Sequence, residues 1–336
     1  MRSDAWLVRS DEGAEHVLRI ANLNKKIIVI SGPTASGKTA LAVELAKIYN
    51  GEIISADSMQ IYTDMDIASA KATKEEQQGI PHYMLGFLDP SESFSVAEYV
   101  KLCDKCVKDI LGRGKTPILC GGTGLYISSF VDNLTFDDSE RDLAYREELK
   151  KFAEEHGNKA LLEKLRAVDP ETAEQLHENN VGRIIRALEV YKTTGHTISQ
   201  AKAMSREAPS PYKFVMITLD FEDREILRER INRRVDDMLE RGLLDEARRC
   251  FEQDAQNIRA TAAQAIGCKE LYPYFRGEKE LSECVEELKL RTRQYAKRQL
   301  TWFRRDKRNL RLVIGKNDEF SDVLKKARFL IDSALD

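Results

Sequence analysis

The chain has 336 residues, of which 53 are Lys or Arg and 56 are Asp or Glu, so its formal net charge is −3. Hydrophobic residues make up 42 % of the chain, which is enough for a sizeable core and excludes extended disorder as the main state. Six cysteines in a chain of this length exclude a small disulfide-held scaffold. The near-neutral total leaves a nucleic-acid partner open, because such binding depends on charge clustered on one surface.

No segment has the sequence pattern of a membrane span or a secretion signal. The longest aliphatic stretch, Ile27–Ile30, is far shorter than the roughly 20 residues that cross a bilayer. Residues 1–24 carry four acidic side chains and no continuous apolar region, so we expect a frayed N-terminal extension rather than a signal peptide. These features predict a cytoplasmic protein without a membrane partner.

Strand and helix patterns alternate along most of the chain. The expected strands are residues 25–31, 52–56, 116–122, 213–221 and 310–315, and the expected helices are 37–49, 95–114, 141–155, 159–167, 180–193, 223–253 and 278–305. This alternation predicts an α/β fold with a parallel sheet flanked by helices. The polar, helical block 133–208 interrupts it, so we expect an inserted helical subdomain between the two parts of one core, 25–132 and 209–336.

The first expected strand is followed by a glycine-rich loop that fits the pattern G-x-x-x-x-G-K-[ST]. Its residues are Gly32, Pro33, Thr34, Ala35, Ser36, Gly37, Lys38 and Thr39. Glycines let backbone amides turn towards phosphate oxygens, while the lysine supplies a cation and the threonine hydroxyl a ligand for Mg²⁺. The loop therefore predicts a P-loop NTPase-like core that binds a diphosphate or triphosphate. A kinase, a GTPase and a group-transfer enzyme all remain open.

Polar residues also follow the second and third expected strands. They are Asp57, Ser58, Met59 and Gln60 after the second strand, and Thr123 within a glycine-rich string after the third. The carboxyl ends of parallel strands share one edge of the sheet, so both groups should lie near the phosphate loop. A carboxylate there can be a general base, and its neighbours can bond a base edge. On its own, the first string is explained equally well as a helix cap.

Cys103 and Cys106 have the C-x-x-C spacing found in zinc sites. A structural zinc site needs four ligands, and the sequence contains neither a second C-x-x-C nor an H-x₃₋₅-H pair. We interpret the two residues as thiols on an amphipathic helix.

Eight strings along the chain together resemble the tRNA dimethylallyltransferase (tRNA isopentenyltransferase) family over about residues 27–306. In order, they are GPTASGKT, DSMQIY, GIPHYM, GGTGLY, GRIIRALEVYKTTG, RINRRVDDMLERGLLDE, AIGCKE and TRQYAKRQLTWFRRD. The resemblance implies a prenyltransferase whose phosphate loop holds dimethylallyl diphosphate, with Mg²⁺ as cofactor, and we expect the protein to be a monomer. Its acceptor would be N6 of the adenosine 3′-adjacent to the anticodon in tRNA, a base that must be flipped out of its loop to be reached.

The resemblance also implies roles for single residues. Asp57 would be the general base and Thr34 a contact near the reacting centre, while Thr123 would face the substrate channel. Arg234, together with Lys38, Thr39 and Mg²⁺, would stabilise the diphosphate leaving group. Contacts to tRNA would come from Asp57, Ser58, Met59, Gln60 and Thr123, from Val181, Gly182, Arg183, Ile184 and Ile185, from the segment Gln264–Lys269, and from the insertion 133–208.

Two strings depart from the family pattern. Ala68–Ala72 has the sequence ASAKA where the family usually has a string like GTAKP, and Cys268 stands where an aromatic residue is usual. The first departure bears on the conformation of a loop and the second on one tRNA contact. Neither changes a residue that would carry the chemistry.

The expected C-terminal helix is strongly basic. Residues 289–311 contain ten Lys or Arg and one acidic residue. At 100° per residue, the apolar arc Leu288, Tyr295, Trp302 and Phe303 is flanked by one row with Lys289, Arg293, Lys297 and Arg304 and by another with Arg291, Arg298 and Arg305. The helix is therefore expected to present both rows to RNA phosphates, Arg293 and Lys297 among them. The alternative is an ordinary solvated amphipathic helix.

Three other functions fit parts of the pattern. An adenylate isopentenyltransferase would share the loop and the donor, but it needs neither the insertion nor the basic helix. A small-molecule P-loop kinase would bind ATP tightly and transfer a phosphoryl group. A non-catalytic RNA-binding P-loop protein would bind tRNA without turnover.

Overall fold

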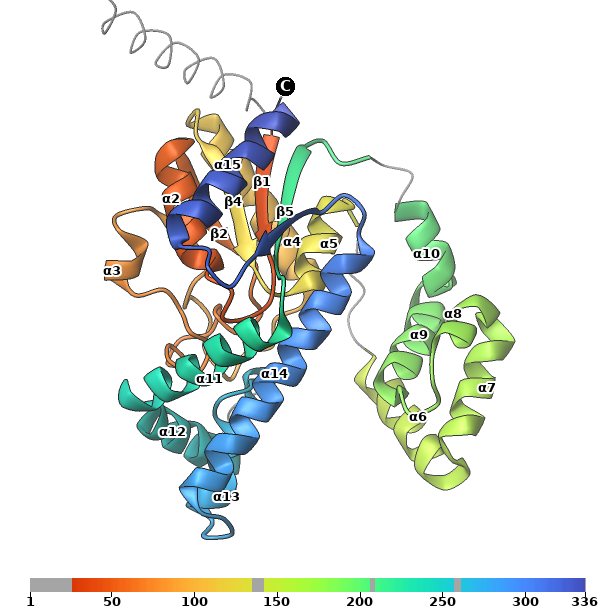
Figure 1. Ribbon diagram of the computed structural model, residues 1–336. Helices are drawn as coiled ribbons and strands as arrows, with labels where there is room; N and C mark the ends of the chain where they lie inside the picture. The colour runs from red at the N-terminus through yellow and green to blue at the C-terminus, as the bar shows by residue number, and fades with distance from the viewer. Residues whose placement is uncertain (1–25, 135–141, 206–208, 257–260, 336) are drawn as a thin grey trace, which may run out of the picture. The chain divides into compact units, whose positions relative to one another are not determined.

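The computed structural model describes residues 26–134, 142–205, 209–256 and 261–335 (Figure 1). These residues belong to two compact units, one formed by the chain up to Ser128 together with Tyr212 onward, and the other by Ser129–Pro211. The expected N-terminal extension, 1–24, lies outside the described residues. None of the described helices combines the length and the apolar character that crossing a bilayer requires.

The first unit is built on a parallel sheet, as the sequence predicts. Its described strands are β1 (Lys26–Ser31), β2 (Gly51–Ser55), β3 (His82–Tyr83), β4 (Thr116–Gly121), β5 (Lys213–Phe221) and β6 (Leu310–Ile314). They lie in the order β3-β2-β4-β1-β5-β6, and each neighbouring pair is parallel. Strand β3 was not predicted from the sequence, because two residues are too few to show a periodic pattern.

Helices cover both faces of this sheet, which explains why its central strands are apolar throughout. Helices α2 (Lys38–Ile48) and α15 (Phe320–Leu335) pack on one another and on the face that carries Ile28 and Ile30 (Figure 1). The alternate residues Ile27 and Val29 are buried as well. Helix α4 (Val96–Gly112) packs on β2 and β4, where the hydroxyl of Tyr99 donates to the Ser55 carbonyl (3.2 Å).

The rest of the first unit is helical and forms a second apolar cluster. It contains α11 (Arg224–Glu240), α12 (Leu243–Ala255), the short elements η1 (Thr261–Gln264), η2 (Lys269–Leu271) and α13 (Tyr272–Phe275), and the long α14 (Leu281–Arg305). The prediction of a single helix over 223–253 is wrong in one respect, because the structure has two helices there. The first, α11, ends at Glu240, because Gly242 (φ +97°) has a left-handed conformation that a continuous helix does not contain. Helices α3 (Lys74–Gln77) and α5 (Gly124–Val131) complete the elements around the sheet.

The second unit is a helical bundle with a core of its own. It contains α6 (Leu143–His156), α7 (Asn158–Val168), α8 (Pro170–Gln175), α9 (Val181–Thr194) and α10 (Ile198–Ser205). Fully buried Leu161, Leu165 and Ile184 lie in this core. The carboxylate of Glu189 is also buried, and it accepts from Arg146 (2.7 Å) and Arg186 (2.6 Å), so its charge is compensated inside the unit.

Candidate active site

The phosphate loop connects β1 to α2 at the carboxyl edge of the sheet. Gly32 has φ +145°, and a Cβ there would lie 3.0 Å from the Leu219 carbonyl oxygen on β5, so the position requires glycine. Gly37 is the N-cap of α2. Thr34, Ala35, Ser36, Gly37, Lys38 and Thr39 line a cavity of about 630 Å³. The first amides of α2, which lack acceptors within the helix, therefore lie at a cavity large enough for a diphosphate.

Lys38 supplies a cation within this loop. Its ammonium donates a hydrogen bond to the carbonyl of Pro33 (2.7 Å). Burial lowers the pKa of Lys38 to about 8, because the ammonium loses solvation. The charge of Arg234 lowers this pKa further, while the Asp57 carboxylate opposes the shift. An anion placed in the loop would favour the charged form of this lysine.

Asp57 begins the turn after β2. The N–H of Met59 donates to its Oδ1 (2.9 Å), a local bond that fixes the carboxylate. Asp57 lines the same cavity as Lys38 and Arg234, and its charge acts on the pKa of both. The bond to Met59 leaves Oδ2 for a substrate, so the carboxylate can take a proton from a group in the cavity.

Thr123 connects the turn after β2 to the turn after β4. Its hydroxyl accepts the N–H of Ser58 (2.9 Å) and donates to Ser58 Oγ (3.3 Å), while its own N–H donates to the Ala56 carbonyl (3.0 Å). Gly121 permits this approach, since a Cβ there would lie 2.1 Å from the Ala56 oxygen. Thr123 is not among the described residues that line the cavity, whereas Ser58 is. Thr123 therefore holds a residue of the cavity wall in place, and its expected position at the substrate channel stays a prediction.

Helix α11 brings a second cation to the cavity. The residues of this helix and its C-cap that line the cavity are Arg234, Val235, Asp237, Met238 and Arg241. Burial lowers the pKa of Arg234, and the charge of Asp57 opposes that shift. A guanidinium nevertheless stays charged, because its ordinary pKa is so high. Lys38, Arg234 and the Asp57 carboxylate thus lie around a single cavity.

Gln299 joins the phosphate loop to the turn after β4, a role that was not predicted from the sequence. This residue is only 5 % exposed. Its Oε1 accepts the N–H of Thr34 (2.8 Å), and its Nε2 donates to the Gly122 carbonyl (2.9 Å). A Cβ on Gly122 would lie 2.2 Å from that nitrogen. The available signal was a polar residue on the buried face of α14, between Ala296 and Phe303.

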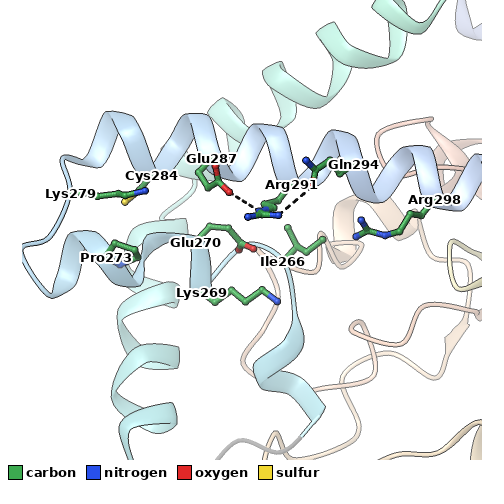
Figure 2. Close-up of a pocket in the computed structure, with 10 residues that line it drawn as sticks. All are labelled: Ile266, Lys269, Glu270, Pro273, Lys279, Cys284, Glu287, Arg291, Gln294 and Arg298. Carbon is green, nitrogen blue, oxygen red and sulfur yellow. Dashed lines mark hydrogen bonds and ion pairs between the residues drawn. The ribbon is translucent and has the colours of Figure 1, made fainter. Parts of the chain in front are cut away.

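A groove of about 540 Å³ lies along α14, next to the cavity (Figure 2). Its lining residues are Ile266, Lys269, Glu270, Pro273, Lys279, Cys284, Glu287, Arg291, Gln294 and Arg298. Three of them, Ile266, Lys269 and Arg298, also line the cavity. Arg291 forms an ion pair with Glu287 (2.6 Å), while the other basic side chains raise the positive charge of the groove. The predicted tRNA-contacting segment Gln264–Lys269 therefore lies where cavity and groove meet.

The two basic rows of α14 differ in what they contact. In one row, Lys289 forms an ion pair with a carboxylate of α11 (2.8 Å), Arg293 donates to an amide of α11 (2.8 Å), and Arg304 pairs with the buried Asp220 of β5 (2.7 Å). The expectation that both rows face phosphates is therefore wrong for most of this row, because neighbouring elements engage three of its cations. The exposed members of the rows are Lys297, Arg304, Arg291, Arg298 and Arg305, and of these Arg304 is the one that pairs with Asp220.

The segment of α9 predicted to contact tRNA is divided between surface and core. Gly182 and Arg183 are exposed. Ile184 and Ile185 are buried in the core of the second unit, and Val181 packs against that core. The prediction needs correction for both isoleucines, because their side chains are used for packing. It stays a prediction for Gly182 and Arg183.

The cysteines fit structural roles. Cys103 and Cys106 are free thiols on α4, as interpreted from the sequence, and burial raises the pKa of each. Cys268, at the position that is usually aromatic in the family, is buried with its Sγ 3.1 Å from that of Cys250. Its side chain therefore packs inside the protein rather than facing RNA. Nowhere in the described ranges do three or more His, Cys, Asp or Glu residues form a metal-binding group.

The phosphate loop at the edge of a parallel sheet, with cations and a carboxylate around one cavity, places this chain in the α/β class of P-loop proteins. A family model described as IPP transferase matches residues 60–306, and one described as isopentenyl transferase matches residues 25–89. The chain belongs to the IPP transferase family, which confirms the resemblance seen in the sequence.

Named relatives and solved structures agree with this assignment. The tRNA dimethylallyltransferase of Thermoanaerobacter sp. (strain X514) is 51 % identical over 280 residues, which are 83 % of this chain and 89 % of the relative. The structure of the tRNA isopentenylpyrophosphate transferase from Bacillus halodurans is 43 % identical with a TM-score of 0.68, and the match covers 93 % of this chain and 97 % of that one. A structure of a eukaryotic dimethylallyltransferase acting on tRNA is 33 % identical with a TM-score of 0.77, covering 91 % and 78 %.

Proposed function

We propose that this protein transfers a dimethylallyl group from dimethylallyl diphosphate to N6 of the adenosine 3′-adjacent to the anticodon in tRNA. The observation that carries the proposal is the lining of one cavity by Asp57, Lys38 and Arg234. Relatives that are named tRNA dimethylallyltransferases support the choice of donor and acceptor. The reaction releases diphosphate.

The proposed chemistry needs a charged site for the leaving group and a base for the amine. The bond between the allylic carbon and the diphosphate oxygen breaks, and its electron pair leaves with the diphosphate. Lys38 and Arg234 stabilise that developing negative charge. The lone pair of N6 forms the new bond to carbon, and the N6 proton passes to the carboxylate of Asp57. Thr34, whose N–H is held by Gln299, lies beside the reacting centre.

The residues of the loop fit Mg²⁺ as a cofactor. This ion prefers oxygen ligands, keeps several waters, and commonly binds through few protein groups together with substrate phosphates. Thr39 offers a hydroxyl on the cavity wall, and the diphosphate would supply further oxygens. When bound, Mg²⁺ would neutralise part of the charge of the diphosphate. The chain's own contribution would be to hold the phosphates with the loop and Lys38.

We propose that the tRNA backbone follows the groove of Figure 2 out of the cavity. The groove meets the cavity at Lys269 and Arg298, so a nucleotide in the cavity would be connected to a strand among these cations. Such contacts supply affinity and orientation rather than base identity. The insertion 133–208 is proposed to contact tRNA as well, with Gly182 and Arg183 on its exposed surface.

Lys297→Ala should flatten the salt dependence of tRNA binding. An exposed lysine that neutralises one phosphate contributes a slope of about 0.7–0.9 in log K against log salt, because its contact releases counterions. We expect a higher KM for tRNA with little change in kcat. Arg293→Ala should change the slope less, since its guanidinium already contacts α11. The control is Lys325→Ala, an exposed lysine on α15. Parallel slopes and equal affinities for Lys297→Ala and wild type would remove the row that carries Lys297 from the RNA path.

Diphosphate binding should be coupled to proton uptake near pH 8. Because the pKa of Lys38 is about 8, about half of this lysine is neutral at that pH. A phosphate anion favours the ammonium, so binding should take up as much as about half a proton at pH 8. The uptake per site should grow, and the affinity fall, as the pH rises further. Calorimetry in buffers of different ionisation enthalpy measures this. Lys38→Ala controls for the titration of diphosphate itself, and equal uptake in both proteins would contradict the prediction.

Two comparisons separate this function from its alternatives. A calorimetric titration should show binding of dimethylallyl diphosphate in preference to ATP, whereas a kinase would show the reverse. Turnover should be seen with an anticodon stem-loop and not with AMP, which excludes an adenylate isopentenyltransferase. A protein that binds the stem-loop without modifying it would be the non-catalytic alternative.

A further inference from the structure

One wall of the cavity is a loop of small residues that follows the turn after β2. We call residues 66–72 the wall loop. Its members Ala68, Ser69, Ala70, Lys71 and Ala72 line the cavity. The loop contains the string that departs from the usual family sequence, and Ala70 has a left-handed conformation (φ +49°) that costs energy in a residue other than glycine. Contacts from elsewhere in the chain must therefore hold this conformation.

The strongest of these contacts comes from Glu246 on α12. Its carboxylate accepts three consecutive backbone N–H groups of the wall loop, from Asp66 (3.0 Å), Ile67 (2.9 Å) and Ala68 (2.8 Å). Glu246 is only 2 % exposed, and within the described ranges no cation lies within ion-pair distance of it. Hydrogen bonds to an ionised acceptor are stronger than neutral ones. The carboxylate thus holds the loop through its backbone.

Gln60 holds the part of the wall loop that follows the three residues bonded to Glu246. Its Nε2 donates to the carbonyls of Ser69 (3.3 Å) and Ala70 (3.2 Å), and its Oε1 accepts the hydroxyl of Ser55 (3.0 Å). Both hydrogens of this amide are therefore directed to the wall loop. Contact between Gln60 and a base edge stays a prediction, but the structure shows that the position of Gln60 and that of the loop depend on one another.

The wall loop also contacts the segment Gln264–Lys269. Gly267 has φ +127°, and a Cβ there would lie 2.8 Å from the Cβ of Ala68. The loop therefore packs closely against this segment as well as against Gln60. Both neighbours belong to segments expected to contact tRNA. The phosphate loop is held by other contacts, namely the bond to Gln299 and the bond of its own Lys38 to the Pro33 carbonyl.

We propose that Glu246 is a positioning residue for the acceptor nucleobase. By fixing the wall loop, it holds Gln60 and Gly267 at the spacing that a flipped-out adenine needs in the cavity. This inference rests on the proposed function. Without the carboxylate, three amides lose their acceptor and the wall loop can shift, whereas the diphosphate site keeps its own contacts. The acceptor side should therefore fail while the donor side stays intact.

Glu246→Gln is the direct test, because the side chain keeps its length but directs an NH₂ group at an amide donor. We expect kcat/KM for an anticodon stem-loop to fall about ten- to a hundredfold, as misplaced contacts in active sites do. Affinity for inorganic diphosphate, measured by calorimetry, should stay within about twofold of wild type, since a shift confined to the acceptor wall leaves the donor contacts unchanged. Glu246→Asp keeps the charge and should lose less. Gln60→Met removes the other contact to the wall loop, so it should also lower kcat/KM for the stem-loop while affinity for diphosphate is kept. This variant tests the inference even if Glu246→Gln does not fold.

The control is Glu52→Gln, which changes another buried carboxylate of the same unit. Glu52 pairs with Arg113 and Lys115 (both 2.6 Å) at the amino end of β2, away from the turn that carries Asp57. This variant should lower the unfolding temperature and leave kcat/KM for the stem-loop unchanged. Equal losses in Glu246→Gln and Glu52→Gln, a parallel loss of diphosphate affinity, or an unchanged Glu246→Gln enzyme would overturn the inference. A wild-type protein that modifies no RNA would instead overturn the proposed function, and this inference with it.

Discussion

Asp57→Asn should lower the rate of dimethylallyl transfer by about 10²–10⁴-fold, the range for loss of a general base. The amide oxygen of asparagine can still accept the N–H of Met59, which bonds to the carboxylate in wild type (2.9 Å), so the turn should keep its shape. The substitution removes the group that takes the N6 proton and little else. Affinity for tRNA should therefore change much less than the rate. Single-turnover measurements with saturating donor and RNA test this most cleanly.

A second carboxylate in the same cavity provides the matched control. Asp237 lines the cavity from α11, so Asp237→Asn removes the same negative charge without removing the proposed base. We expect this variant to lose less than about tenfold in rate, because a missing neighbouring charge changes the barrier less than a missing base. A wild-type single-turnover rate in Asp57→Asn would end the assignment of Asp57 as the base.

Arg234→Ala should cost roughly 10²–10³-fold in transfer, the loss typical when one group that stabilises developing charge is removed. Burial already lowers the pKa of this arginine, which marks a position where water contributes little to charge stabilisation. The loss should be largest at low donor concentration, and tRNA binding should be kept. Arg233→Ala is the matched control, since Arg233 is its exposed neighbour on α11. Unchanged kinetics across donor concentrations for Arg234→Ala would remove it from the site.

Local patterns were enough to predict the phosphate loop and every described strand of the sheet except the two-residue β3. Buried parallel strands are continuous apolar runs, and the loop requires glycines at fixed spacing, so both are visible in short windows of sequence. Helix α15 has an equally clear pattern, since its buried residues Val323, Ala327 and Ile331 recur every four positions. It was nevertheless not predicted. The break at Gly242 was overlooked because a glycine within an otherwise helical pattern is often tolerated.

The contacts that shape the site could not be predicted in the same way. Gln299 meets Thr34 across 265 positions of sequence, and Glu246 meets Ala68 across 178. No local periodicity identifies such partners. The same reason explains the wrong expectation for one basic row of α14, because Lys289 and Arg293 are engaged by residues of α11. Helical geometry predicts which side chains share a face, but it does not predict what covers that face.

Mass analysis of the RNA product tests the central claim most directly. The protein is incubated with an unmodified anticodon stem-loop, dimethylallyl diphosphate and Mg²⁺, and the RNA is then digested to nucleosides. We predict that one adenosine, the one 3′-adjacent to the anticodon, gains the mass of a single dimethylallyl group in place of a hydrogen, with release of diphosphate. Asp57→Asn should give little of this product in the same time. An unmodified stem-loop, or a dimethylallyl group found on AMP in preference to RNA, would contradict the proposed function.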